Sequence, residues 1–201
     1  MAIVAAVAAV AAVLLVPSEP SRSSAPAGRS AGTKPTTPVS SSTTDSRPVR
    51  EDCSTRSGAT FPGAFTDPRN LVVGPLVLIG GAYTPASTVR EFGGNKFPLL
   101  VKAGHTVTVR LPPSARAVAG LAYGPLPQGR QVTVRDAHQA VTFVACRRGG
   151  PADSSADGIA VTFWSGGVAA RAPACVALEV YVDREPSPRH VGLSLGRRCG
   201  Q

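Results

Sequence analysis

The chain has 201 residues, enough for one ordinary domain with an extension, and 21 Lys and Arg against 12 Asp and Glu give it a formal net charge of +9. Residues 1–52 hold five basic and four acidic groups, so residues 53–201 hold 16 basic and 8 acidic groups, a net charge of +8. This sign favours polyanions such as acidic wall polymers, anionic lipid headgroups or nucleic acid. Because the arginines are scattered and few aromatic residues lie among them, the alternative is an arginine-rich composition with no specific partner, and we expect no nucleic acid.

The chain begins with an apolar segment, which we assign to residues 1–16. The run Ala2 to Val16 ends at Pro17 and is shorter than the roughly 20 residues that a membrane-spanning helix needs. Its length is typical of a signal peptide, but no Lys or Arg precedes it. Residues 1–16 are therefore either a signal peptide or an N-terminal membrane anchor.

Residues 17–52 are rich in Ser, Thr, Pro and Ala and contain almost no large apolar side chains. Such a composition cannot bury enough surface to offset the entropy of an ordered chain. We expect a disordered linker that ends where the domain begins, at Cys53.

Residues 53–201 contain short apolar runs separated by Gly and Pro. The stretch 97–113, FPLLVKAGHTVTVRLPP, indicates a hairpin, and its second arm alternates with Val107, Val109 and Leu111 facing inward. We expect a similar strand around Val132 and Val134.

Four further strands are expected from QAVTFVAC, IAVTFW, CVALEVYV and HVGLSLG. Many short strands at this spacing predict an all-β, immunoglobulin-like β-sandwich.

One segment differs from this pattern and predicts a single short helix over residues 84–94. Thr84 is expected at the N-cap, Pro85 at the first helical position and Gly93 just beyond the end.

The even number of cysteines, behind a segment that resembles an export signal, predicts two disulfides in an oxidising, extracytoplasmic compartment. Four cysteines allow three pairings. We favour Cys146–Cys175, joining the ends of two strands, with Cys53–Cys199 fastening the two ends of the domain.

The only tryptophan, Trp164, lies in the sequence FWSGG, in which residues 165–167 predict a turn or bulge. Trp164, Cys146 and Cys175 share the outward parity of their strands, so we do not expect the disulfide-on-tryptophan core of immunoglobulin domains. Trp164 either packs at the edge of the core or forms an exposed platform for sugar rings or a membrane interface, with Tyr123 and Tyr181 as candidate partners.

Motifs for common chemistries are absent from the sequence. FWSGG lacks the first glycine of the nucleophile elbow, although Ser165 with His105, His138 or His190 is a conceivable arrangement. The histidines show no zinc-binding spacing, and Met1 is the only methionine, which argues against a blue-copper site. We expect no metal and no cofactor.

Other catalytic patterns are also missing. VLIGGAYTP does not have the glycine spacing of a dinucleotide-binding loop. Asp153 and Asp157 lie in a Gly/Ser loop suited to turns rather than to a catalytic carboxylate pair.

The chain contains the sequences FWSGG, ACVALEVYV and HVGLSLGRRC, which follow an apolar segment and a Ser/Thr/Pro-rich linker. With these features it resembles uncharacterised exported proteins of high-GC Gram-positive bacteria over residues 130–201. This resemblance implies a location and no activity. It also offers an alternative reading of the arginines, as the product of a GC-rich genome without a specific partner.

We therefore expect an exported or membrane-anchored protein of the cell envelope that acts as a non-catalytic binding or structural module. The alternative is an extracellular hydrolase with an unrecognised site. The expected partner is an anionic envelope polymer or another envelope protein, with membrane attachment through the N-terminus if residues 1–16 are retained. The candidate binding residues are Trp164, Tyr123, Tyr181, Arg147, Arg148, Arg197 and Arg198.

Overall fold

The computed structural model describes residues 48–148 and 154–200, which form an all-β sandwich with one short helix. The predicted segment 1–16 and the linker up to residue 47 lie outside the described residues. The linker prediction extended too far, because Val49–Glu51 already forms strand β1, upstream of the expected boundary at Cys53. No helix in the described part of the chain is long and apolar enough to cross a membrane.

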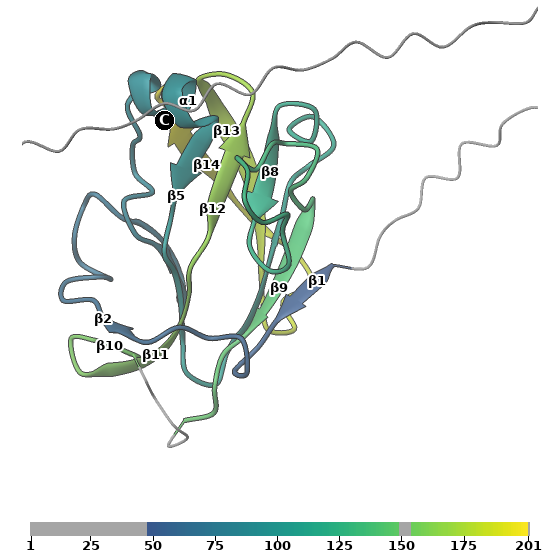
Figure 1. Cartoon of the computed structure of the whole chain (residues 1–201). Helices are drawn as coiled ribbons and strands as arrows, with labels where there is room; N and C mark the ends of the chain where they lie inside the picture. Colours follow the sequence, from purple (N-terminus) through teal and green to yellow (C-terminus); the bar gives the residue numbers. More distant parts are fainter. Residues whose placement is uncertain (1–47, 149–153, 201) are drawn as a thin grey trace, which may run out of the picture. The chain divides into compact units, whose positions relative to one another are not determined.

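One layer of the sandwich is a five-stranded sheet in the order β1-β9-β7-β13-β14 (Figure 1). After β1, its strands are β9 (Ala140–Val144), β7 (Thr106–Arg110), β13 (Ala174–Val182) and β14 (Arg189–Leu195). β1 runs parallel to β9, and all other neighbours in this sheet are antiparallel. Alternate residues of β7, β9 and β13 are buried, as the period of two in the sequence predicts.

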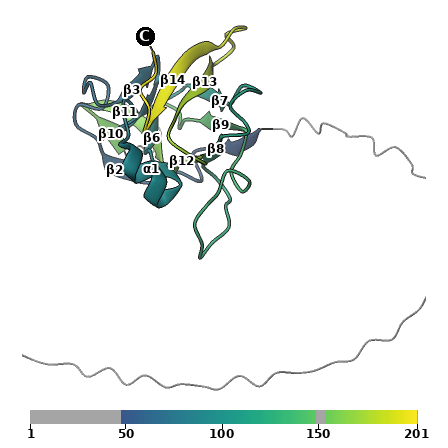
Figure 2. The ribbon, with the colours of Figure 1, turned by 90° about the horizontal axis from the view of Figure 1, so that it is seen from above.

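The opposite layer is a six-stranded sheet in the order β2-β10-β11-β6-β4-β3, and Figure 2 shows the two layers side by side. Its strands are β2 (Ala59–Thr60), β10 (Ser154–Ala156), β11 (Ile159–Trp164), β6 (Leu99–Lys102), β4 (Leu76–Leu78) and β3 (Leu71–Val73). β4 and β6 are buried on both faces, which explains their uninterrupted apolar sequences.

A three-stranded sheet, β5 (Gly94–Lys96), β12 (Gly167–Ala170) and β8 (Ala119–Ala122), completes the fold next to helix α1 (Ala86–Phe92). The predicted helix is confirmed, and Gly93 ends it in the left-handed conformation, with φ of 65°.

The start of α1 differs from the prediction. Pro85 occupies the N-cap position, where no side chain caps the helix. The buried Thr84 hydroxyl instead accepts a hydrogen bond from the Asn95 side chain at 2.9 Å. Thr84 therefore links the residues that precede the helix to β5 and does not cap the first helical turn.

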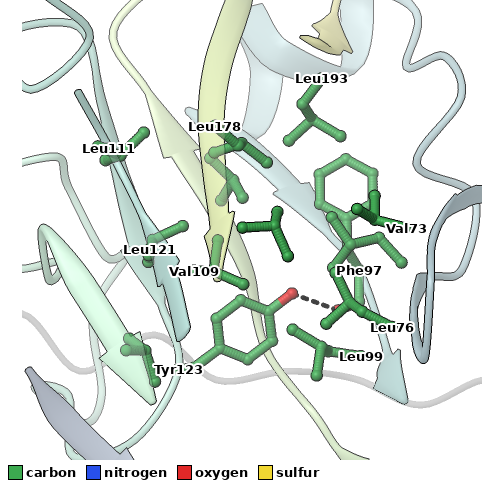
Figure 3. Packing of buried hydrophobic residues seen from close by; sticks show 14 of the residues in the cluster. Val73, Leu76, Phe97, Leu99, Val109, Leu111, Leu121, Tyr123, Leu178 and Leu193 are labelled. Atoms are coloured by element: carbon green, nitrogen blue, oxygen red, sulfur yellow. Dashed lines mark hydrogen bonds between the residues drawn. The ribbon is translucent and has the colours of Figure 1, made fainter. Parts of the chain in front are cut away.

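The main core lies between the layers and draws apolar side chains from all three sheets. Figure 3 shows Tyr123 within this core, with its hydroxyl donating to the Phe97 carbonyl oxygen at 2.7 Å. Burial strongly raises the pKa of the Tyr123 hydroxyl, which therefore remains a neutral hydrogen-bond donor.

A second apolar cluster covers the outer face of the six-stranded sheet. Val77, Leu100 and Phe163 belong to it, and Phe61 and Phe65 from the segment between β2 and β3 pack over them. The Phe61 and Phe163 rings meet edge to face at 4.9 Å. This sheet is therefore apolar on both sides, unlike a sheet with one solvated face.

The expected hairpin over residues 97–113 is not formed. β6 pairs with β4 and β11, whereas β7 pairs with β9 and β13 in the other layer. The short link around Gly104, with φ of 85°, carries the chain from one sheet to the other. The reason is that β6 is apolar on both faces and needs a central place in a covered sheet.

The strand expected around Val132 and Val134 is also absent, because a turn occupies residues 134–136. The Asp136 carboxylate accepts hydrogen bonds from the Thr133 N–H at 2.9 Å and from its hydroxyl at 2.7 Å, which fixes the turn. Val132 and Val134 still contribute to a small apolar cluster with Ala137.

The two disulfides are confirmed, but their pairing corrects the prediction. The bonds are Cys53–Cys146 and Cys175–Cys199, with Cα–Cα distances of 4.9 and 5.0 Å. β9 and β13 are both antiparallel to β7 and therefore run in the same direction. Cys146 follows the end of β9 and Cys175 lies near the start of β13, so these two cysteines lie at opposite ends of the sheet. Two disulfides are typical of an oxidising, extracytoplasmic environment.

Candidate functional site

Four segments that are distant in sequence converge at one end of the sandwich, which we call the α1 end: residues 82–93, 115–118, 170–174 and 194–199. The Thr84 N–H donates to Ser194 O at 2.8 Å, and the Ala170 N–H donates to Gly93 O at 2.8 Å. The Arg171 N–H donates to Val118 O at 3.0 Å. Backbone hydrogen bonds therefore join these segments into one surface, with α1 at the front when it is viewed from above (Figure 2).

The α1 end is strongly basic. Its four segments contain five arginines and one carboxylate, that of Glu91. The arginines are Arg90, Arg116, Arg171, Arg197 and Arg198. Within residues 48–148 and 154–200, none of the five forms an ion pair. Their charges are therefore available to an anionic ligand instead of being neutralised internally.

Exposed apolar side chains lie among these arginines. Phe92 is 59 % exposed at the last position of α1, Tyr83 is 45 % exposed and Val118 is 40 % exposed. The Arg198 guanidinium lies 5.1 Å from the centre of the Tyr83 ring, within the range of a cation–π contact. This contact places the Arg198 side chain next to one of these exposed apolar side chains.

The opposite end of the sandwich carries Arg147 and Arg148, both exposed. Arg148 Nε donates to the Ala103 carbonyl oxygen at 3.5 Å. The described segments at this end, 52–57, 102–106, 146–148, 156–158 and 182–188, contain five Lys or Arg and four Asp or Glu. The charges therefore nearly balance, and the structure separates Arg147 and Arg148 from Arg197 and Arg198.

The candidate aromatic platform is not present at the surface. Trp164 is 1 % exposed and Tyr123 is 2 % exposed, and both rings contact Phe143 in the core, with centroid distances of 5.2 Å each. Tyr181 is half-buried on β13. Because the stacking faces of Trp164 and Tyr123 are buried, these two side chains cannot receive a sugar ring, which corrects their assignment as binding residues.

The outward parity expected for Trp164 is also corrected. Trp164 does lie on the opposite face from Phe163, but it is Trp164 that faces the main core, while Phe163 faces the outer cluster. The Trp164 indole N–H donates to the Asp52 carbonyl oxygen at 3.1 Å and to the Thr55 hydroxyl at 3.2 Å. Trp164 thus anchors the segment that follows β1.

The two glycines of FWSGG are explained by close packing. A Cβ atom on Gly166 would overlap the Tyr123 ring and lie 2.7 Å from Ala122 O, and one on Gly167 would overlap Asn95 O. The segment forms the passage from β11 to β12, where the chain leaves the six-stranded sheet. FWSGG is therefore a tightly packed connection between sheets.

The structure does not assemble a Ser–His arrangement in the described residues. Ser165 is exposed and has no hydrogen bond to a histidine there. His105 Nδ1 lies 2.8 Å from Asp183 Oδ2, His138 Nε2 lies 3.2 Å from the Pro125 carbonyl oxygen, and His190 is exposed. No group of three or more potential metal ligands occurs in the described part either.

A pocket of about 350 Å³ lies on the outer surface near the segment between β2 and β3. Its lining includes Asp67 and Arg69, and the Arg69 guanidinium donates to the Asp67 carboxylate at 2.6 Å. This hydrogen bond lowers the pKa of Asp67 to about 2. A carboxylate held in its ionised form is poorly suited to exchange protons near neutral pH, so the pocket does not favour general acid–base chemistry.

Sequence reasoning named Arg197 and Arg198 but missed Arg90, Arg171 and Phe92. The available signal was compositional: the four segments of the α1 end combine arginines with almost no carboxylates. The four segments are far apart in the sequence, and which loops lie side by side depends on the order of the strands in the sheets. Comparisons with protein-family models, curated proteins and solved structures return no match.

Proposed function

We propose that the protein is an exported module of the cell envelope that binds an anionic envelope component through the α1 end and catalyses no reaction. The observation that carries this proposal is the concentration of positive charge. Five arginines against one glutamate give this end a net charge of +4, half of the +8 carried by residues 53–201. A field of this sign attracts anions before contact and orients the domain towards them.

Two further observations support the proposal. Elsewhere in the described domain many arginines are compensated, as in the pairs Arg130–Asp136 at 2.6 Å and Arg189–Glu185 at 2.7 Å. Among the residues that the structure describes, the arginines of the α1 end form no such ion pair, so binding an anion there does not require breaking one. The disulfides agree with a function outside the cytoplasm.

The proposal is tested by titrating the full chain with long-chain polyphosphate, a soluble polyanion, at low and high salt. We expect the double variant Arg197→Gln/Arg198→Gln to raise the Kd about tenfold, from roughly 0.7 kcal/mol for each exposed guanidinium. The matched control is Arg147→Gln/Arg148→Gln, which removes the same charge from the opposite end. Binding that is unchanged by high salt, or equally weakened in both variants, would contradict the proposal.

A further inference from the structure

We propose that the anionic component bound by the α1 end is the surface of an anionic lipid bilayer, into which Phe92, Tyr83 and Val118 insert. This inference rests on the proposed function and specifies its partner. A hydrated anionic polymer needs positive charge alone. A bilayer interface also accepts apolar side chains beneath its charged headgroups, and a surface that combines both features matches it.

The distribution of exposed apolar groups supports a lipid partner. In the described residues five large hydrophobic side chains are exposed, and three of them, Phe92, Tyr83 and Val118, lie at the α1 end. Isolated exposed hydrophobics are ordinary on a protein surface, but a group of them surrounded by cations marks an interaction site. Phe92 is the most exposed of the five.

Arginines and exposed apolar side chains are carried by the same hydrogen-bonded segments at the α1 end. Arg171 bonds through its backbone to Val118, the preceding Ala170 bonds to Gly93 beside Phe92, and Arg198 stacks on Tyr83. Long arginine side chains can place guanidinium groups at the level of lipid phosphates while neighbouring rings lie deeper. The arrangement therefore offers both parts of an interfacial contact over the same segments.

The apolar side chains are presented by a fixed part of the fold. Val89 on the inner side of α1 is 2 % exposed, and the Gly93 carbonyl oxygen at the C-terminal end of the helix accepts a hydrogen bond from the Ala170 N–H at 2.8 Å. Gly196, which follows β14, donates its N–H to Thr84 O at 2.8 Å. The exposure of Phe92 thus results from a helix held on both sides, and insertion requires no rearrangement of the backbone.

A position-specific fluorescence experiment tests this inference with the full chain. The variant Phe92→Trp is mixed with vesicles of 70 % phosphatidylcholine and 30 % phosphatidylglycerol that carry brominated acyl chains, which quench a nearby indole. Ile159→Trp is the matched control, because Ile159 is 39 % exposed and lies at the start of β11, away from the α1 end. Trp164 is buried in both variants and contributes the same background.

We expect a blue shift and quenching of the Phe92→Trp emission with the anionic vesicles, and neither change for Ile159→Trp. Pure phosphatidylcholine vesicles should leave both emissions unquenched, even if the N-terminal apolar segment attaches the chain to them. Adding Arg197→Gln/Arg198→Gln should raise the lipid concentration for half-maximal quenching about 25-fold, or about fivefold for each arginine. Adding Arg147→Gln/Arg148→Gln should leave it unchanged.

Each other outcome is decisive. Equal quenching at positions 92 and 159, or no quenching at either, overturns insertion through the α1 end. Polyphosphate binding that depends on Arg197 and Arg198 without any quenching retains the proposed function and identifies a polymer as the partner. Failure to bind either probe overturns the inference and the proposed function together. Unchanged thermal midpoints of the tryptophan variants exclude misfolding as the cause of a negative result.

Discussion

The two disulfides should contribute unequally to stability, because they close loops of very different length. Cys53–Cys146 spans 93 residues and Cys175–Cys199 spans 24. In the chain-entropy treatment, the longer loop corresponds to about 4.7 kcal/mol and the shorter one to about 3.4 kcal/mol at 25 °C. We therefore expect Cys53→Ala/Cys146→Ala to lower the free energy of unfolding by more than Cys175→Ala/Cys199→Ala does.

The measurement is equilibrium unfolding in urea at neutral pH, followed by the fluorescence of Trp164, whose indole bonds to the Asp52 backbone beside Cys53. Each double variant retains the other disulfide, so each is the control for its partner. A larger loss of stability in Cys175→Ala/Cys199→Ala would refute the reasoning. So would a peptide that links Cys146 to Cys175 in a non-reducing digest of the native protein.

Two further predictions concern local packing and pH. Gly166→Ala should destabilise the domain by about 1–3 kcal/mol in urea unfolding, because the added methyl group overlaps the Tyr123 ring, whereas Gly200→Ala, with open space around it, should be neutral. The pKa of Asp67, read by NMR, should lie near 2 and return towards its ordinary 3.8 in Arg69→Gln. Because this pKa is depressed, the stabilisation from Asp67 is complete above the ordinary pKa and is lost as the pH falls from about 4 towards 2. A pKa of Asp67 that does not change in Arg69→Gln would contradict the assigned cause.

The strands with one buried face were predictable from the sequence, because alternation of side chains is a local property. In β7 the buried residues are Val107 and Val109, and in β13 they include Val176 and Leu178, as the period of two indicates. The C-terminal boundary of helix α1 at Gly93 was equally predictable, since the left-handed conformation there favours glycine.

The six-stranded sheet was harder to predict because it is covered on both faces. In β11 Phe163 and Trp164 are both buried, so alternation cannot show which side faces the centre of the sandwich. Which of the two side chains faces the main core depends on Phe61 and Phe65, which pack over Phe163 from a distant segment. The incorrect hairpin prediction has the same cause. β6 is apolar along most of its length, so its sequence does not show which strands it pairs with; that depends on which other parts of the chain cover its two faces.

The disulfide pairing and the candidate site depend on strand direction in the same way. Once β9 and β13 are known to run parallel to each other, Cys146 and Cys175 are at opposite ends, and the loops carrying Arg171 and Arg197 are brought to one end. Neither the disulfide pairing nor the common location of these arginines can be read from the spacing of residues in the sequence, because the relative direction of two strands is set only in the completed sheet. The chain carries nearly twice as many basic as acidic groups. The topology concentrates part of this excess positive charge at the α1 end. An electrostatic field that orients the domain depends on this local concentration of charge more than on the total net charge. A variant with unchanged net charge, in which Arg197 and Arg198 are replaced by Gln and the exposed Ser54 and Ser187 of the opposite end by Arg, should therefore raise the Kd for polyphosphate as much as the double variant alone.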